Sequence, residues 1–150
     1  MQLTRHTDYA LRLLIHLAGS GGARFQIADV AEAQAISRTH LMKIANELAR
    51  GGVIEAMRGR GGGIWLARDP ADIRLGDVVR AMEPRHSMVD CTSCRLVDGC
   101  GLPFVLHKAS AAFHEVLDRF TLADILDKRK PAKPGKAVNP PPVTPALPAA

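Results

Sequence analysis

All three cysteines of this 150-residue chain lie in one ten-residue stretch, CTSCRLVDGC, as Cys91, Cys94 and Cys100. Thiolates bind zinc, copper(I) and iron–sulfur clusters. Glycines on both sides of Cys100 allow the backbone to turn several times toward one centre. Structural zinc sites and the common clusters take four ligands. The stretch therefore predicts a metal or cluster site that lacks one evident donor.

The identity of the fourth donor is open from the residues alone. His86 and His107 lie near the cysteines in sequence, but a lone histidine is more often an ordinary surface or core residue. Because structural zinc sites are closed by Cys or His, three cysteines with no obvious fourth favour an iron–sulfur cluster with an unusual ligand. Structural zinc and metal-free thiols stay as alternatives. The chain shows no acid–base pair or nucleophile–base arrangement, so we do not expect an enzyme.

A second group of residues has the types and spacing expected of a DNA-binding surface. Helical patterns at 27–33 and 38–50 are separated by a three-residue break, and a glycine-rich turn, RGRGGG, follows between two strand-like segments. This order predicts a helix-turn-helix with a wing, whose second helix enters the major groove. The side chains expected to contact DNA are Ser37, Arg38, Thr39, His40 and Lys43 on that helix and Arg58 and Arg60 on the wing.

Other elements must hold these two sites in place. Apolar spacing predicts a helix over 4–18 and another over 75–83, while 53–57 and 64–67 suit the strands of the wing. A long helix is expected from Pro103 to about Phe120, with a short helix to Leu126 after it. The apolar stripe of the long helix predicts a two-fold dimer, and the alternative is that it covers the core of its own chain.

The net charge of +5 does not come from this folded part. Residues 128–150 hold five of the 20 basic residues and none of the 15 acidic ones, so residues 1–127 are neutral overall. Seven of the ten prolines also lie from 131 onward, and this composition predicts a disordered arm. No stretch is long and apolar enough to span a membrane, and no export signal is evident, so we expect a cytoplasmic protein.

The combination of these stretches resembles the winged-helix iron–sulfur transcription regulators, and among them the nitric oxide-sensing repressors. The resemblance covers residues 1 to about 127 and rests on LTRHTDYALRLL, ISRTHLMKIANELARGGVI, RGRGGGIWLA, the three-cysteine loop and FTLADIL. It implies a homodimer that binds double-stranded operator DNA and leaves it when nitric oxide reacts with the cluster.

The resemblance also implies a fourth ligand. In such repressors an aspartate from the first helix of the partner subunit completes the set, and the matching residue is Asp8. Members that sense cluster status use a histidine three residues after the last cysteine, where this chain has Pro103. The implied cofactor is a [4Fe-4S] cluster, with [2Fe-2S] as the alternative. Regulation by iron–sulfur or redox status, or DNA binding with structural zinc, are the competing functions.

The predicted fold is mainly α with a small β-hairpin wing: a winged helix-turn-helix plus a long dimerisation helix. We expect a DNA-binding domain over 1–83 and a cysteine loop over 84–102. A dimerisation helix with a short last helix is expected over 103–127, and a disordered basic tail over 128–150.

Overall fold

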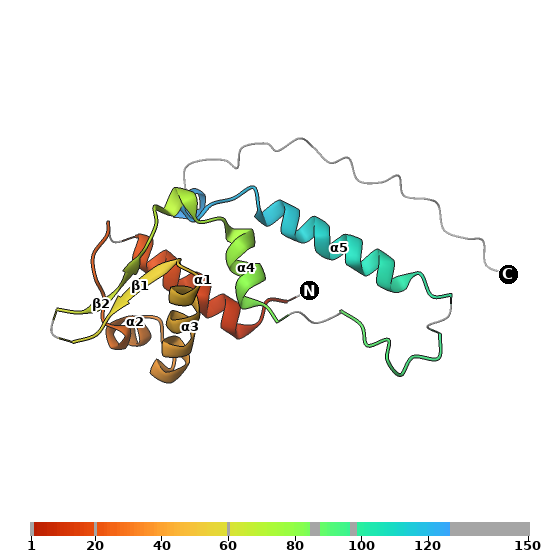
Figure 1. Ribbon diagram of the computed structural model, residues 1–150, viewed down its shortest axis with the longest axis horizontal. Helices are drawn as coiled ribbons and strands as arrows, with labels where there is room; N and C mark the ends of the chain where they lie inside the picture. The colour runs from red at the N-terminus through yellow and green to blue at the C-terminus, as the bar shows by residue number, and fades with distance from the viewer. Residues whose placement is uncertain (1, 20, 60, 85–87, 97–98, 127–150) are drawn as a thin grey trace.

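The computed structural model describes residues 2–19, 21–59, 61–84, 88–96 and 99–126. The first half contains α1 (Arg5–Ala18), α2 (Ile27–Ala33), α3 (Arg38–Arg50), β1 (Ile54–Met57) and β2 (Gly63–Leu66). The second half contains the 3-10 turn η1 (Pro70–Asp72), α4 (Leu75–Met82), α5 (Leu102–Leu117) and α6 (Leu122–Leu126). In Figure 1 the first three helices, the hairpin and α4 form one body, and α5 extends beyond it.

Helix α1 is the central element of that body. Thr4 caps its N-terminus by accepting a hydrogen bond from the Thr7 N–H. The apolar residues at helical spacing along it, Ala10, Leu13, Leu14 and Leu17, are all buried. They pack with the equally buried inner faces of α2 and α3 in a single hydrophobic cluster. The 3.6-residue period of the sequence therefore identified the core of the helix-turn-helix correctly.

The wing is an antiparallel hairpin in which Ile54 pairs with Leu66 and Met57 with Gly63. Phe25 adds a bridge on the outer side of β2, because its N–H and C=O both bond to Ile64. A side chain at Gly63 would place its Cβ only 2.8 Å from the Phe25 carbonyl oxygen. Glycine is needed there because the two backbones approach so closely.

The predicted winged-helix fold is confirmed, with small changes in boundaries. The helices α2 and α3 have the expected bounds, and each strand is within one residue of its predicted start and end. The prediction for the long helix was wrong at its C-terminal end, since α5 stops at Leu117 and Phe120 lies outside it. The backbone leaves the helix because the Phe120 carbonyl accepts a hydrogen bond from the Leu75 N–H, at 2.9 Å.

The segment after α5 returns to the winged helix. The Leu122 N–H donates to the Ile73 carbonyl at 2.8 Å, and the Leu122 side chain is completely buried against the core. Thr121 and Asp124 exchange hydrogen bonds at the start of α6, in the reciprocal pattern of a capping box. The winged-helix body thus includes α6, although the sequence placed that helix with α5.

Arg80 and Asp118 fasten the C-terminal end of α5 to α4. Both guanidinium NH2 groups of Arg80 donate to the Asp118 carboxylate, at 2.6 and 3.1 Å. The hydrogen bond from Arg80 holds the pKa of Asp118 below its ordinary value. The paired geometry is the strong, orientation-specific form of this interaction.

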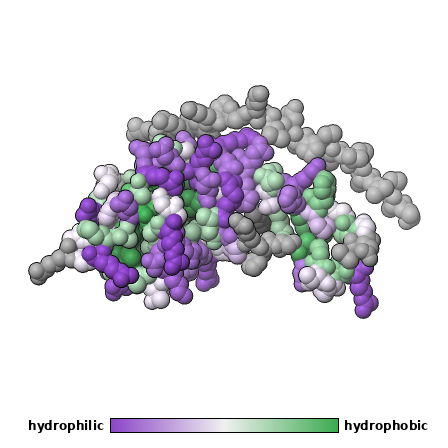
Figure 2. Space-filling view, in the orientation of Figure 1, coloured by the Kyte–Doolittle hydropathy of each residue, from purple (hydrophilic) through white to green (hydrophobic). Residues whose placement is uncertain are grey.

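No residue of α5 is buried among the residues that the structure describes. Figure 2 shows green, hydrophobic residues at the surface over this helix. Among the residues that the structure describes, no helix is long and apolar enough to cross a membrane. The predicted basic tail over 128–150 lies outside the described residues.

Candidate DNA-binding surface and cysteine site

The N-terminal half of α3 presents the predicted DNA-contacting residues on one side. Ser37, Arg38, Thr39 and Lys43 are exposed, and His40 is half-buried. Ser37 occupies the N-cap position of α3, but its side chain makes no capping hydrogen bond. Four of these five residues, all but Arg38, also line a shallow depression of about 450 Å³ together with His6 of α1. The structure therefore brings four of the five predicted helix residues together around one depression.

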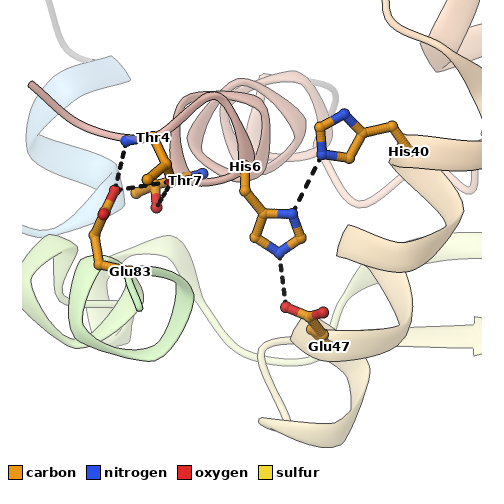
Figure 3. Close-up of polar contacts among 6 residues, drawn as sticks. All are labelled: Thr4, His6, Thr7, His40, Glu47 and Glu83. Carbon is orange, nitrogen blue, oxygen red and sulfur yellow. Dashed lines mark hydrogen bonds and ion pairs between the residues drawn. The ribbon is translucent and has the colours of Figure 1, made fainter. Parts of the chain in front are cut away.

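His40 is the member of this surface that α1 holds most closely. Its Nε2 lies 3.3 Å from Nδ1 of His6, and the two rings are stacked with centroids 5.5 Å apart. The Tyr9 ring packs edge-on against His40 at 5.2 Å. The other nitrogen of His6 makes a 2.7 Å hydrogen bond with the Glu47 carboxylate (Figure 3).

The wing supplies Arg58 on a glycine turn. Gly59 and Gly61 both have left-handed backbone angles, with φ of 96° and 75°, which glycine adopts readily. Arg58 is exposed, while Arg60 lies outside the described residues. Arg24 is a cation that the sequence reasoning missed: its guanidinium group lies 4.4 Å from the centre of the Trp65 ring on β2. No local pattern would have revealed it, because the contact joins residues 41 positions apart.

The cysteine residues lie in the loop that leads from α4 to α5. All three thiols are free, with Cys91 and Cys94 half-buried and Cys100 exposed. The Cys94 N–H faces the Cys91 carbonyl at 3.4 Å, which bends the backbone between these two residues. Gly99, with φ of 112°, turns the chain just before Cys100.

The donor chemistry of this loop fits a thiolate-ligated group, because three reduced thiols share one short segment. The loop does not bring them together in the single chain: within residues 88–96, 99–126 and the earlier described ranges, no three His, Cys, Asp or Glu side chains are grouped as metal ligands. His107 is exposed on α5, and His86 lies outside the described residues.

Asp8 lies in the first turn of α1 with its side chain 43% exposed. Its carboxylate pairs with Arg12, one turn further along, at distances of 2.9 and 3.1 Å. An exposed pair of this kind is held weakly in water, by about 0.5 kcal/mol. The carboxylate is thus at the surface, and exchange of Arg12 for another cationic partner has a small energetic cost.

The start of α1 is also tied to the end of α4. The Glu83 carboxylate accepts hydrogen bonds from the Thr4 N–H at 2.8 Å and from the Thr4 hydroxyl at 3.0 Å (Figure 3). Burial raises the pKa of Glu83, but hydrogen bonds from Thr7 and Thr4 outweigh it and hold the pKa below its ordinary value. Sequence reasoning missed this contact, because Thr4 and Glu83 are 79 residues apart.

A helix-turn-helix with a basic, glycine-tipped wing and a neighbouring cysteine loop defines the class of winged-helix transcriptional regulators. The chain belongs to the Rrf2 family, described as iron-dependent transcriptional regulators, whose family model matches residues 3–128. It is therefore a transcriptional regulator, and the expectation that it is not an enzyme is confirmed.

Individual relatives agree with this assignment. The chain is 47% identical over 135 residues to the HTH-type transcriptional regulator NsrR of Geobacillus kaustophilus (strain HTA426), covering 86% of this chain and 92% of that protein. The solved structure of T. potens IscR is 27% identical with a TM-score of 0.70, over 91% of this chain and 94% of that one. Staphylococcus aureus CymR, at 23% identity and a TM-score of 0.67, shares the fold over 85% of this chain and 100% of its own.

Proposed function

We propose that this chain is a cytoplasmic, dimeric repressor that holds an iron–sulfur cluster and releases its operator when nitric oxide is present. The observation that carries the proposal is the set of three free thiols, Cys91, Cys94 and Cys100, in the loop between α4 and α5 of an Rrf2 winged helix. The 47% identity to NsrR supports the nitric oxide-sensing type, which the sequence also resembles.

In this proposal α3 and the wing bind the operator. The exposed hydroxyls of Ser37 and Thr39 and the ring of His40 suit hydrogen bonds to base edges or phosphates, at the end of the helix that enters the groove first. Arg38 and Lys43 suit phosphate contacts, and Arg58 and Arg60 of the wing suit the minor groove. Because residues 1–127 are neutral overall, binding depends on this local concentration of positive charge rather than on net charge.

A second copy of the chain is the proposed partner of α5. Val105, Ala109, Ala112 and Val116 are all exposed and recur at helical spacing. Val105 and Val116 are 59% and 50% exposed, as is usual for a surface that is covered by a partner rather than by water. Two-fold dimers of winged-helix proteins place two recognition helices one turn of DNA apart.

The three cysteines are the proposed cluster ligands, and Asp8 of the partner subunit is the proposed fourth. When bound, the cluster supplies iron atoms that combine with nitric oxide; [4Fe-4S] is the proposed type and [2Fe-2S] the alternative. A carboxylate is a hard ligand beside soft thiolates, so Asp8 is the member of the set expected to leave most easily. Asp8 lies at the surface and pairs only weakly with Arg12, so its carboxylate can change partners at a small energetic cost.

The test is an anaerobic gel-shift titration of a cognate operator fragment with the cluster-loaded dimer. We expect nitric oxide to weaken binding at least tenfold, a coupling of about 1.4 kcal/mol. Equal binding with and without nitric oxide would disprove the sensing role. The control is the same titration with a scrambled fragment, on which nitric oxide should have no effect.

Metal and sulfide analysis of anaerobically purified protein separates the alternatives. Zinc without acid-labile sulfide would establish a structural-zinc DNA-binding protein. A cluster that controls operator binding but is indifferent to nitric oxide would establish a sensor of iron–sulfur or redox status. Asp8→Ala with an unchanged visible spectrum and unchanged cluster stability would remove Asp8 from the ligand set.

A further inference from the structure

We infer that His6 is a positioning residue that transmits the state of the first turn of α1 to the recognition helix. This inference rests on the proposed function and deepens it, because it names the contact through which the cluster side of the molecule would act on α3. His6 lies in the same turn as Asp8, and its ring is directed at α3 (Figure 3).

Both nitrogens of the His6 ring are engaged by α3. The Nε2 atom bonds to the Glu47 carboxylate at 2.7 Å, and the Nδ1 atom lies 3.3 Å from Nε2 of His40. His40 and Glu47 are seven residues apart, which is roughly 10 Å along a helix axis. One half-buried side chain of α1 thus contacts α3 at two positions that are about two helical turns apart.

The polar contacts of His6 add a directional restraint on the orientation of α3 relative to α1. The contact between α1 and α3 also includes buried core residues such as Ala10 and Leu41 and the Tyr9 ring against His40. The buried stripe of α3, which includes Leu41 and Ile44, sets the face that this helix turns toward the core, while the hydrophobic driving force itself is non-directional. Hydrogen bonds weaken steeply away from linear geometry, so the His6 contacts restrain the rotation of α3 about its axis within narrower limits. That rotation sets the direction in which Thr39 and Lys43 point.

The first turn of α1 is held at its other end as well. Glu83 at the end of α4 accepts hydrogen bonds from Thr4, so this turn lies between the segment that enters the cysteine loop and the helix that reads DNA. Because a helical turn moves as a unit, a displacement of Asp8 would carry His6 with it. Because Glu47 and His40 contact the His6 ring, this displacement would act directly on them.

The experiment compares wild type with His6→Ala and with the matched control His16→Ala. His16 is also a half-buried histidine of α1, but its side chain contacts Gln34 and Phe25, neither of which belongs to α3. Operator affinity is measured for the cluster-loaded and the cluster-free dimer of each variant, and the ratio of the two affinities is the readout. Hydrogen exchange of the α3 amides in cluster-free protein provides a second readout that does not depend on the cluster.

We expect His6→Ala to reduce the affinity ratio by about fivefold, the change produced by one net hydrogen bond of about 1 kcal/mol. Exchange of the α3 amides should become faster in the same variant. The variant His16→Ala should keep the wild-type ratio and wild-type exchange in α3. The variant His6→Gln, whose amide can still donate to Glu47, should restore part of the ratio.

A wild-type ratio near one would overturn the proposed function, and the inference with it. A large wild-type ratio that His6→Ala leaves unchanged would overturn the inference alone. Should His6→Ala fail to fold or to load the cluster, Glu47→Ala removes the same bond from the α3 side. If Glu47→Ala keeps the same affinity ratio as wild type, the inference is overturned. A reduced ratio in Glu47→Ala supports it.

Discussion

The exposed apolar face of α5 gives a quantitative prediction for Val105→Glu. Val105 lies on the same side of the helix as Ala109, Ala112 and Val116, and 59% of it is exposed in the single chain. If a second copy covers this face, glutamate there removes apolar burial and also places a charge in the interface. We expect the dimer to dissociate at concentrations at which wild type stays associated.

The size of the effect follows from the exposed fraction. Full burial of a valine side chain stabilises by about 1.5–3 kcal/mol, so covering the exposed part of Val105 contributes roughly 1 kcal/mol per protomer. A two-fold interface contains the substitution twice, which gives roughly 2 kcal/mol, or about a 30-fold increase in the dimer Kd. Two desolvated carboxylates add to this loss, so 30-fold is a lower bound.

Sedimentation equilibrium over a concentration series measures the dimer Kd directly. The matched control is Ala111→Glu, which adds the same charge to an exposed alanine roughly 120° around the helix from Val105. Its Kd should stay close to that of wild type. An unchanged Kd in Val105→Glu, or equal effects of the two substitutions, would refute the assignment of this face to the dimer.

Three further predictions concern stability and DNA binding. Gly76→Ala should destabilise the fold by about 1–3 kcal/mol in denaturant titrations, because the new Cβ would collide with the Asp118 side chain and lie 3.1 Å from its backbone nitrogen; an unchanged midpoint would contradict the close α4–α5 contact. Asp118→Asn should lower the thermal midpoint at neutral pH, where wild type keeps its charged pair with Arg80. Since the folded-state pKa of Asp118 is lowered, wild type should lose this advantage as the pH falls through that pKa, and a gap that persists in stronger acid would contradict the account. Lys43→Ala should reduce the slope of log affinity against log salt by about one, as expected for one lost phosphate contact; an unchanged slope would remove Lys43 from the DNA-binding surface.

Much of the fold could be predicted from local patterns in the sequence. The apolar spacing of α1 and α3 identified residues such as Leu13 and Leu41 that are completely buried, and RGRGGG marked the hairpin turn. Local patterns were also sufficient to place the candidate DNA-contacting residues on one helix and one turn. These features depend on neighbours three or four residues away, or on the backbone freedom of glycine.

Contacts between residues that are far apart in the sequence could not be predicted from it. The pairing of Phe120 with Leu75 ended α5 earlier than its apolar stripe predicted. The contacts of His6 with Glu47 and of Thr4 with Glu83 join residues 41 and 79 positions apart, and polar residues at a helix start carry no signal of such partners. The role of Asp8 was likewise assigned from family resemblance alone, and it stays a prediction.

The return of α6 to the first body has a consequence for synthesis on the ribosome. Leu122 is completely buried against a core formed mainly by residues of the first half of the chain, and its N–H completes a backbone pairing with Ile73. If only residues 2–84 of a nascent chain have left the ribosome, the apolar surface that Leu122 covers in the complete fold stays exposed. The winged helix is therefore completed only after α5 has left the ribosome and become available to another copy of the chain. A prematurely terminated product that lacks α6 is thus expected to expose apolar core surface and to be less stable than the complete chain.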